Sequence, residues 1–381
     1  MIKIHSYTIK EVNSHSDYLD FIELPFLLYR DNPYWVPPIK KDYLLYLKGK
    51  NNSLSSCPHK LFLAIKDFKV VGRLLVFIDI ELNSYHSEKN GYIAEFESIE
   101  DVEVSNLLLD KALEFCKEHG MDFIKGPVSL PGGEDHRGFV VNKFNTPPTV
   151  MNIYNFKYYN DYWMDYGFTK YYDCYAYRAD KEDLRDNVHR IKEILPKIVK
   201  RFNYRIDTIN LKDLDKDLSD IYEVLNLALP REWKDFKPLS LEEIHETFQL
   251  LRPFMDTDFI CIARNSEEKP IGFNIALPDY NEILIKLKGK MGLAGLVKFL
   301  YYRKKIKKIR MFVLFVVPEY RKKGVSAAIY FKCFANAINK NYSQLEGSTI
   351  WEYNKAMITD VEKFGAKRDI IYRIYKKEIQ Y

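Results

Sequence analysis

Residues 316–326 read Val-Val-Pro-Glu-Tyr-Arg-Lys-Lys-Gly-Val-Ser, a short basic turn that contains one glycine. The apolar run at 311–317 predicts a buried strand before the turn, and 325–339 predicts a helix after it. A strand, a turn and a helix in this order leave the first N–H groups of the helix without backbone partners, and the helix dipole adds positive potential there. The segment therefore predicts an anion site suited to phosphate.

The elements around this turn repeat an order that the first half of the chain also shows. In the first half, strands are expected at 2–9, 61–65, 70–80, 92–98, 123–126 and 171–178, and helices at 17–29, 104–119 and 154–165. In the second half, strands are expected at 204–209, 259–264, 270–277, 311–317, 347–352 and 368–376, and helices at 214–229, 241–251, 325–339 and 354–364.

A charged helix at 181–202 is expected to join the halves, with a kink or break at Pro196. An aromatic residue and a glycine end the last helix of each half, at 166–167 and 364–365, and a Tyr-rich strand follows. The sequence therefore predicts a mixed α/β fold with a mixed sheet, duplicated in two domains. We expect domain 1–180 to be the acceptor-side or structural half and domain 181–381 to carry the phosphate loop.

Composition places the chain among globular proteins, with 47% hydrophobic and 29% charged residues. The 58 basic and 53 acidic residues nearly balance, which gives no reason to expect nucleic acid as a partner. The five cysteines are scattered and form no metal-binding spacing with histidine, so we expect no metal and a reducing, cytoplasmic compartment. We expect no signal peptide, because the sequence from residue 1 lacks an apolar core and a cleavage site, and no membrane span, because the chain has no run of 18 apolar residues.

The long polar loop at 127–148 in the first half contains Glu134 and His136, which could form an acid/base pair or lie in a solvated surface turn. The strand at 92–98 is followed by an acidic segment at 99–103, in the place where the second half has its basic turn. Because acidic side chains repel pyrophosphate, we expect the first half not to bind a phosphate there.

Residues 286–310 contain ten basic side chains and no acidic one, around an apolar stretch at 292–302 that could be an amphipathic helix. The segment could be a solvated basic face, or it could bind an anionic membrane surface or an acidic acyl carrier protein. Nucleic acid is the weaker choice, because no DNA- or RNA-binding motif accompanies the segment.

The basic turn resembles the acyl-CoA-binding motif of the GNAT acyltransferase superfamily, which is Arg or Gln, two residues, Gly, one residue, then Gly or Ala. Arg321 and Gly324 fit this motif, and Ser326 departs slightly from it. Asn354 and the pair at 364–365 resemble a second motif of the superfamily, an Asn that opens the last helix and an aromatic–glycine pair that ends it. The whole chain looks like a tandem GNAT protein with a degenerate first domain, as in large bacterial proteins of this type.

This resemblance implies acetyl-CoA or a longer acyl-CoA as co-substrate. The backbone of Val316 and Val317 would hold the pantetheine arm, and Asn354 would touch the arm or the thioester. The pyrophosphate would lie against the N–H groups of the turn, which comprises Arg321, Lys322, Lys323, Gly324, Val325 and Ser326.

Catalytic groups are less well defined by the resemblance. Many members have a Tyr as general acid at the position of Val361, so Tyr353 or a water would have to replace it. Glu352 is the nearest carboxylate by topology, although a surface ion pair would explain it equally well. With Glu134 and His136, these residues form our catalytic candidates. We expect acyl transfer from acyl-CoA or acyl carrier protein to a small-molecule amine by direct attack. The alternative is a CoA-binding or regulatory protein without turnover.

Overall fold

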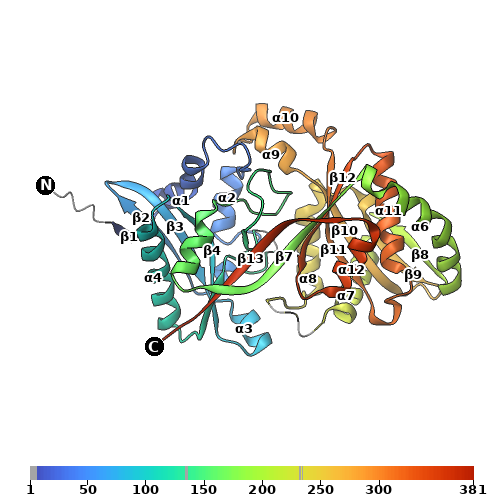
Figure 1. The fold of residues 1–381 in the computed structure, drawn as a ribbon, viewed down its shortest axis with the longest axis horizontal. Helices are drawn as coiled ribbons and strands as arrows, with labels where there is room; N and C mark the ends of the chain where they lie inside the picture. Colours follow the sequence, from blue (N-terminus) through green and yellow to red (C-terminus); the bar gives the residue numbers. More distant parts are fainter. Residues whose placement is uncertain (1–6, 134–135, 231–232, 234) are drawn as a thin grey trace. The chain divides into compact units, whose positions relative to one another are not determined.

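The computed structural model describes residues 7–133, 136–230, 233 and 235–381, and their contacts divide the chain into two compact units (Figure 1). Unit 1 comprises the residues up to Cys174 together with Asn281–Lys304 and Ile370–Tyr381, and unit 2 comprises Tyr175–Tyr280 and Lys305–Asp369. Both units are therefore discontinuous in sequence, whereas the sequence analysis divided the chain once, after residue 180.

Unit 1 contains a mixed sheet. Its elements in chain order are β1 (Thr8–Glu11), α1 (His15–Leu28), α2 (Lys40–Leu47), η1 (Leu54–Ser56), β2 (His59–Lys66), β3 (Lys69–Phe77), α3 (Ile80–His86), β4 (Asn90–Ser98), α4 (Val102–Glu118), β5 (Phe123–Gly126), β6 (Phe139–Val140), α5 (Tyr158–Asp165) and the start of β7 (Thr169–Asp180), with α9 (Asn281–Leu287) and α10 (Leu293–Arg303) inserted later in the chain. Strands β1 to β4 pair antiparallel in order, β4 and β5 pair parallel, and the end of β13 (Lys367–Glu378) pairs antiparallel with β5.

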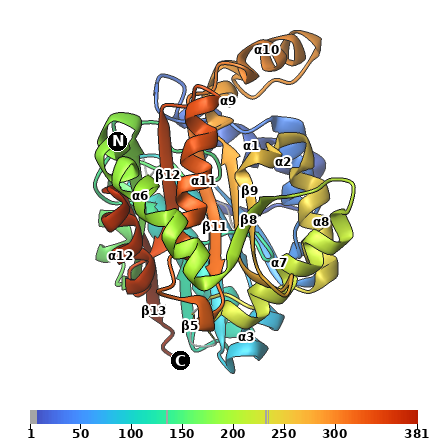
Figure 2. The same ribbon diagram turned by 90° about the vertical axis from the view of Figure 1, so that its right-hand side faces the viewer.

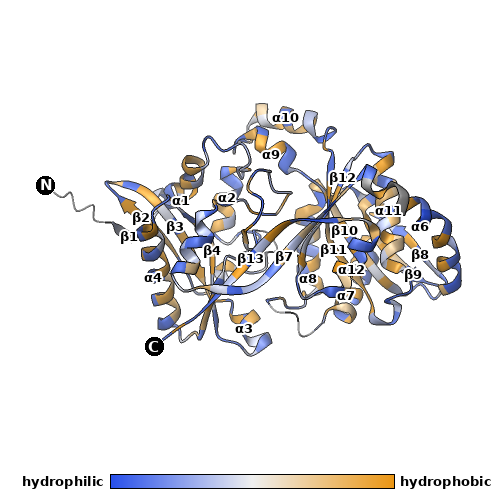
Figure 3. Cartoon of the chain, viewed as in Figure 1, coloured by the Kyte–Doolittle hydropathy of each residue, from blue (hydrophilic) through white to orange (hydrophobic). Residues whose placement is uncertain are grey.

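Alternation along β2 and β3 explains how this sheet is covered. Phe62 and Leu74 point into a core shared with α4. Arg73, the residue before Leu74 in β3, donates to the carbonyl of Phe21 on α1. Side chains of a strand alternate between faces, so α4 and α1 cover opposite faces of the sheet. Hydrophobic and hydrophilic residues both occur along α4, as expected for a helix with one face on a sheet (Figure 3).

Unit 2 repeats this plan. Its elements are the end of β7, α6 (Lys181–Phe202), β8 (Tyr204–Thr208), α7 (Leu214–Ala228), α8 (Leu241–Leu251), η2 (Arg252–Phe254), η3 (Thr257–Phe259), β9 (Ile260–Asn265), β10 (Pro270–Pro278), β11 (Lys308–Val316), η4 (Pro318–Tyr320), α11 (Val325–Asn339), β12 (Gln344–Trp351), α12 (Lys355–Phe364) and the start of β13. Strands β8 to β11 pair antiparallel in order, and β11 pairs parallel with β12. Figure 2 shows α6 and α11 on one face of these strands, with α7 and α8 on the other.

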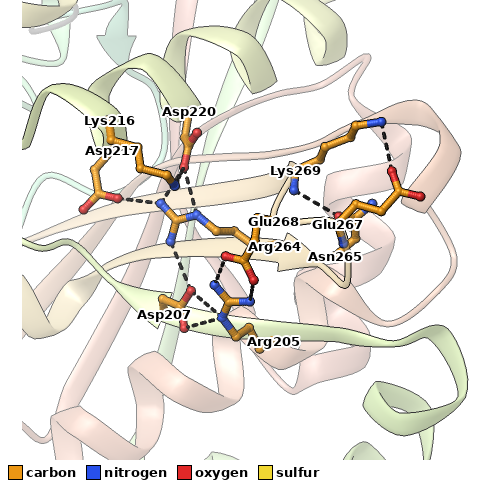
Figure 4. A network of polar contacts seen from close by, with 10 residues as sticks. All are labelled: Arg205, Asp207, Lys216, Asp217, Asp220, Arg264, Asn265, Glu267, Glu268 and Lys269. Atoms are coloured by element: carbon orange, nitrogen blue, oxygen red, sulfur yellow. Dashed lines mark hydrogen bonds and ion pairs between the residues drawn. The ribbon is translucent and has the colours of Figure 1, made fainter. Parts of the chain in front are cut away.

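A buried ion cluster fastens α7 to the sheet of unit 2 (Figure 4). Arg264 on β9 is 5% exposed and contacts three carboxylates, at 3.0 Å for Asp207, 2.5 Å for Asp217 and 2.5 Å for Asp220. Asp207 also binds Arg205, which lies on the same strand and is exposed. The guanidinium offers five donors in a fixed plane, so one side chain satisfies carboxylates from β8 and α7 at once.

Among the described residues the expected order of elements is confirmed, and strand β6 and helices α2, α3 and α9 are additional. Of the strand expected at 2–9, residues 2–6 lie outside the described residues. Of the kink or break expected at Pro196, the break does not occur, because helix α6 is continuous across this residue. Helices α2, α3 and α9 were not expected from the sequence, because each is only seven or eight residues long and its pattern is short. None of the helices among the described residues is long and apolar enough to cross a membrane.

Candidate functional site

Strands β11 and β12 are paired only over their first halves and then separate. They pair over four positions, from Lys308 opposite Gln344 to Met311 opposite Gly347. β11 then continues to Val316 paired with β10 alone, while β12 runs on to Trp351. The described part of β11 beyond Met311 therefore has one edge that β12 does not cover.

Val316 directs its backbone toward this uncovered edge. The N–H of Val317 donates to the carbonyl of Ile271 on the β10 side at 3.0 Å. Because the N–H and C=O of successive residues in a strand point in opposite directions, Val316 turns its own groups the other way. An extended group that lay along this edge could pair with Val316 as an added strand does, which is the arrangement expected for a pantetheine arm.

The turn after β11 leaves the start of α11 open. Gly324 is the N-cap residue in the left-handed conformation, with φ +77°, and no side chain caps the helix. A Cβ at Gly324 would lie 2.8 Å from Cγ2 of Ile198 on α6, so the position requires glycine both for its φ and for space. Ala328 donates to the Gly324 carbonyl at 2.9 Å, and the N–H groups of Val325, Ser326 and Ala327 precede this first helical bond. These donors fit the two phosphates of a CoA.

The basic side chains of the turn have different surroundings. Arg321 donates from Nε to the Val316 carbonyl at 3.3 Å and from Nη2 to the Ala228 carbonyl at 2.9 Å. Its guanidinium thus braces the turn against the last carbonyl of α7, where a cation is favourable. Lys322 is exposed in the left-handed conformation, and the Lys323 ammonium lies 4.5 Å from the ring centre of Tyr320. The lysines therefore supply positive charge around the open helix start.

The corresponding helix of unit 1 is closed by its own side chain. Asp101 is the N-cap of α4, and its carboxylate accepts the N–H of Glu103 at 3.0 Å. The same carboxylate accepts a hydrogen bond from Tyr7 and lies 3.9 Å from Lys66. A carboxylate here occupies the donors that an external phosphate would need, so unit 1 lacks the anion site of unit 2.

Two of the catalytic candidates lie just after the end of β12. Glu352 accepts from the Tyr175 hydroxyl at 3.5 Å, and the ring of Tyr353 lies 5.5 Å from that of Trp351. Asn354 accepts the N–H of Met357 at 3.2 Å, so its side chain caps α12. Val361 is buried, as an ordinary apolar contact of α12.

Aromatic rings gather beside the diverging strands, a feature that the sequence analysis missed. Trp233 lies 5.6 Å from Phe315 on β11 and 4.7 Å from Trp351 on β12, and Phe236 lies 6.1 Å from Trp351. The rings come from three separate segments, so no periodic pattern in the sequence marks them. They provide an apolar surface next to the uncovered edge of β11.

A buried polar group at the base of the divergence contains Arg310, which the sequence analysis counted in the basic segment at 286–310; its burial removes it from any face that could bind a partner. Arg310 on β11 is 1% exposed and lies opposite Glu346 in the parallel ladder. It donates to the Ser348 carbonyl from Nε and Nη2 at 3.2 and 3.1 Å, and the Ser348 hydroxyl donates to Glu346 at 2.7 Å. Arg310 and Glu346 lie just outside the strands expected at 311–317 and 347–352, so no strand pattern in the sequence marked the pair.

The other two catalytic candidates are Glu134 and His136, and His136 belongs to unit 1. Glu134 lies outside the described residues. His136 lies 3.8 Å from Glu95 of β4, whose carboxylate also contacts Arg73 at 2.9 Å and accepts from Tyr43. Glu95 follows an irregular register between β3 and β4 and has φ +55°. His136 is therefore placed beside a carboxylate that the sequence analysis did not single out.

The next carboxylate along β4 has the opposite electrostatic environment. Burial opposes ionisation of Glu95, but the contacts with His136 and Arg73 lower the pKa of its carboxyl to about 2. Burial raises the pKa of Glu97 to about 7, although Arg73 and the hydroxyls of Tyr159 and Tyr29 act in the other direction. Those hydroxyls donate to Glu97 at 2.7 and 2.8 Å. Unit 1 thus holds one ionised and one readily protonated carboxyl group side by side.

Among the described residues, no group of three or more His, Cys, Asp or Glu side chains could hold a metal ion. The open helix start and the uncovered strand edge of unit 2 together offer donors for phosphate oxygens and a pairing edge for an extended group.

Known proteins resemble this chain over nearly its full length. No protein-family profile matches it. It is 26% identical over 371 residues to protein YghO of Escherichia coli K12, covering 96% of this chain and 93% of that protein. It is 26% identical over 370 residues to a bacterial ceramide synthase of Caulobacter vibrioides, covering 94% of each chain.

Among solved structures, a tandem GNAT protein from the clavulanic acid biosynthesis pathway, determined without AcCoA, matches with a TM-score of 0.59. The match covers 99% of both chains at 10% identity. The repeated order of elements, the parting of β11 from β12 and this full-length match lead to one conclusion. The chain has the tandem GNAT fold.

Proposed function

We propose that the protein transfers an acyl group from an acyl-CoA, or from the phosphopantetheine of an acyl carrier protein, to an amine. The observation that carries this proposal is the contrast between two equivalent helix starts. Gly324 leaves the start of α11 open and surrounded by lysines, whereas Asp101 closes the start of α4. An open helix start directly beside an uncovered strand edge suits a pyrophosphate followed by an extended arm.

The aromatic rings support a donor with an acyl chain longer than acetyl. Trp233, Phe315 and Trp351 lie beside the strand edge along which the pantetheine arm would run. Apolar rings stabilise a chain of methylene groups by about 0.8 kcal/mol for each group removed from water. An acetyl group has too little apolar surface to pack against these rings.

The similarity to the Caulobacter protein named bacterial ceramide synthase supports a long-chain amine as acceptor. A ceramide is an N-acyl derivative of a long-chain amino alcohol, so an enzyme of that name forms an amide. We propose the same bond type for this protein: the amine nitrogen attacks the thioester carbonyl, the C–S bond breaks, and the thiolate takes up a proton as the amine loses one. Glu352 and Tyr353 are the proposed proton-transfer groups.

Titration calorimetry with CoA, acetyl-CoA, octanoyl-CoA and holo-acyl carrier protein tests the donor. We expect octanoyl-CoA to bind more tightly than acetyl-CoA, and Lys322→Glu to weaken both about tenfold by reversing one charge beside the pyrophosphate. Lys212→Glu, at another exposed lysine of unit 2, is the matched control and leaves binding unchanged. Absence of binding to every donor would refute the proposal.

Release of free thiol from octanoyl-CoA, with sphinganine as acceptor and mass spectrometry of the amide, tests turnover. A second candidate function, binding of CoA without catalysis, is favoured by one observation. The position of the usual acid is Val361, which is buried in the packing of α12. Tight donor binding without amide formation from any long-chain amine would support this second function.

A further inference from the structure

Helix α10 of unit 1 exposes a continuous apolar stripe. Five of its side chains are largely exposed: Leu293 87%, Leu296 49%, Val297 68%, Leu300 57% and Tyr301 57%. Their spacing, i, i+3, i+4, i+7 and i+8, places all five on one side of the helix. The opposite side carries the buried Gly295 and the less exposed Phe299 and Tyr302. The helix therefore turns its apolar side away from the protein.

The preceding helix shows that this exposure is not caused by a loose insertion. Helix α9 buries Ile283 completely and Leu287 to 6% exposure. The side-chain amide of Asn281 donates to the Pro148 carbonyl at 2.9 Å, and the backbone N–H of Lys40 donates to the Gly289 carbonyl at 3.2 Å. A Cβ at Gly289 would lie 2.4 Å from Phe26. The segment is fastened to unit 1 at α9, and Figures 1 and 2 both show α10 lying outside α9.

Positive charge surrounds the stripe. The exposed basic residues of the insert in unit 1 are Lys286, Lys288, Lys290, Lys298, Arg303 and Lys304. Glu282 is the one acidic residue of this insert, and it lies at the start of α9. On the helix, Lys298 and Arg303 lie on either side of the apolar stripe, because they are separated from its centre by about a quarter turn or more.

We propose that α10 docks unit 1 on the surface of an anionic phospholipid bilayer. The five apolar side chains enter the boundary between headgroups and acyl chains, and the lysines and arginines contact lipid phosphates. An acidic carrier protein would match the charges but would leave the apolar stripe without a complement. This inference does not depend on the proposed acyl transfer.

Vesicle flotation of the full chain tests the docking. Vesicles of phosphatidylcholine with about 30% phosphatidylglycerol are compared with phosphatidylcholine alone, and binding is expected to the anionic vesicles and to weaken as salt rises. The double variant Leu296→Glu with Leu300→Glu should lower partitioning at least about tenfold, since it places two charges in the stripe. The control, Leu19→Glu with Leu27→Glu, changes two leucines of α1 that are each 48% exposed, and should not affect binding.

Val297→Trp provides a readout of depth. The fluorescence emission of the introduced tryptophan should shift to shorter wavelength with anionic vesicles and should be quenched by brominated lipid. Failure of the wild-type chain to float with anionic vesicles would overturn the proposal. Equal flotation of the stripe variant, or binding of acyl carrier protein that is lost in the same variant while vesicles are ignored, would also overturn it. Unchanged thermal unfolding and CoA binding of the stripe variant exclude misfolding as the cause of a loss.

Discussion

The hydroxyl of Ser326 donates to the carboxylate of Asp360 at 2.7 Å, which joins the first turn of α11 to α12. A negative charge is therefore held beside the helix start that we assign to pyrophosphate. The carboxylate stabilises the positive end of the helix dipole and would oppose a phosphate bound there, because both groups are anions.

Asp360→Asn is expected to tighten CoA binding about two- to fivefold, the effect of roughly 0.3–1 kcal/mol for one charge at a helix end. The amide oxygen can still accept the Ser326 hydrogen bond, so the fold should be retained. Calorimetry at low and high salt measures the effect, which should shrink as salt screens the charge. Asp165→Asn, at an exposed carboxylate of unit 1, is the control. Weaker binding by Asp360→Asn would show that the carboxylate supports the ligand.

Gly324→Ala should abolish or greatly weaken CoA binding and lower the free energy of unfolding by about 1–3 kcal/mol, because a non-glycine residue is strained at positive φ. The added Cβ also meets Ile198 at 2.8 Å. Two controls separate these causes: Gly120 has φ +68° with open space around its Cβ, and Gly292 has open space without a positive φ. Urea unfolding should rank the alanine variants Gly324, Gly120, Gly292 in order of decreasing cost.

The Glu97 carboxyl predicts how stability depends on pH. Its pKa is about 7 in the folded protein and 4.5 ordinarily, so the folded state binds the proton more tightly. Stability contributed by this group is present below pH 4.5 and is lost as pH rises through 7, by up to about 3 kcal/mol. Glu97→Gln should therefore gain stability relative to the wild type between pH 5 and 8. Urea unfolding at several pH values measures the difference, and parallel curves for the two proteins would contradict it.

Arg264→Met should destabilise unit 2 by about 3–5 kcal/mol, since it leaves the buried carboxylates of Asp217 and Asp220 without their common partner. Arg205→Met, at an arginine of β8 that is 47% exposed, removes surface ion pairs with Asp207 and Glu268 and should cost no more than about 1 kcal/mol. Denaturant unfolding of both variants gives the comparison. If both substitutions lowered the free energy of unfolding by similar amounts, the burial of Arg264 would make no difference to the cost of removing its charge.

Trp233→Ala should reduce the preference for octanoyl-CoA over acetyl-CoA, because one of the rings beside β11 is removed. The expected loss is about tenfold for octanoyl-CoA and little for acetyl-CoA, in keeping with about 0.8 kcal/mol for each methylene group left in water. Calorimetry with the two donors measures it. An equal loss for both donors would assign the ring to the pantetheine arm or to the fold.

Periodicity and turn chemistry were sufficient to predict most of the elements. Residues 325–339 carry an apolar face at helical spacing behind a glycine turn, and the observed α11 has the same bounds. Local signals of the same kind predicted β9, β10 and α8, the last with the observed bounds. These elements are determined by residues that are close together in the chain, so they can be predicted from the sequence alone.

Three-dimensional packing decided the rest. The choice of Gly324 depends on Ile198 of another helix, and the Trp233 and Trp351 rings meet from distant segments. The sequence predicted a strand at 92–98, but not that Arg73 and His136 would gather around Glu95. The sequence by itself determined a strand, a basic turn and a helix at residues 311–339. Only the tertiary structure decided that β12 diverges there and leaves an edge uncovered, because pairing between distant strands is set by the packing of the whole sheet.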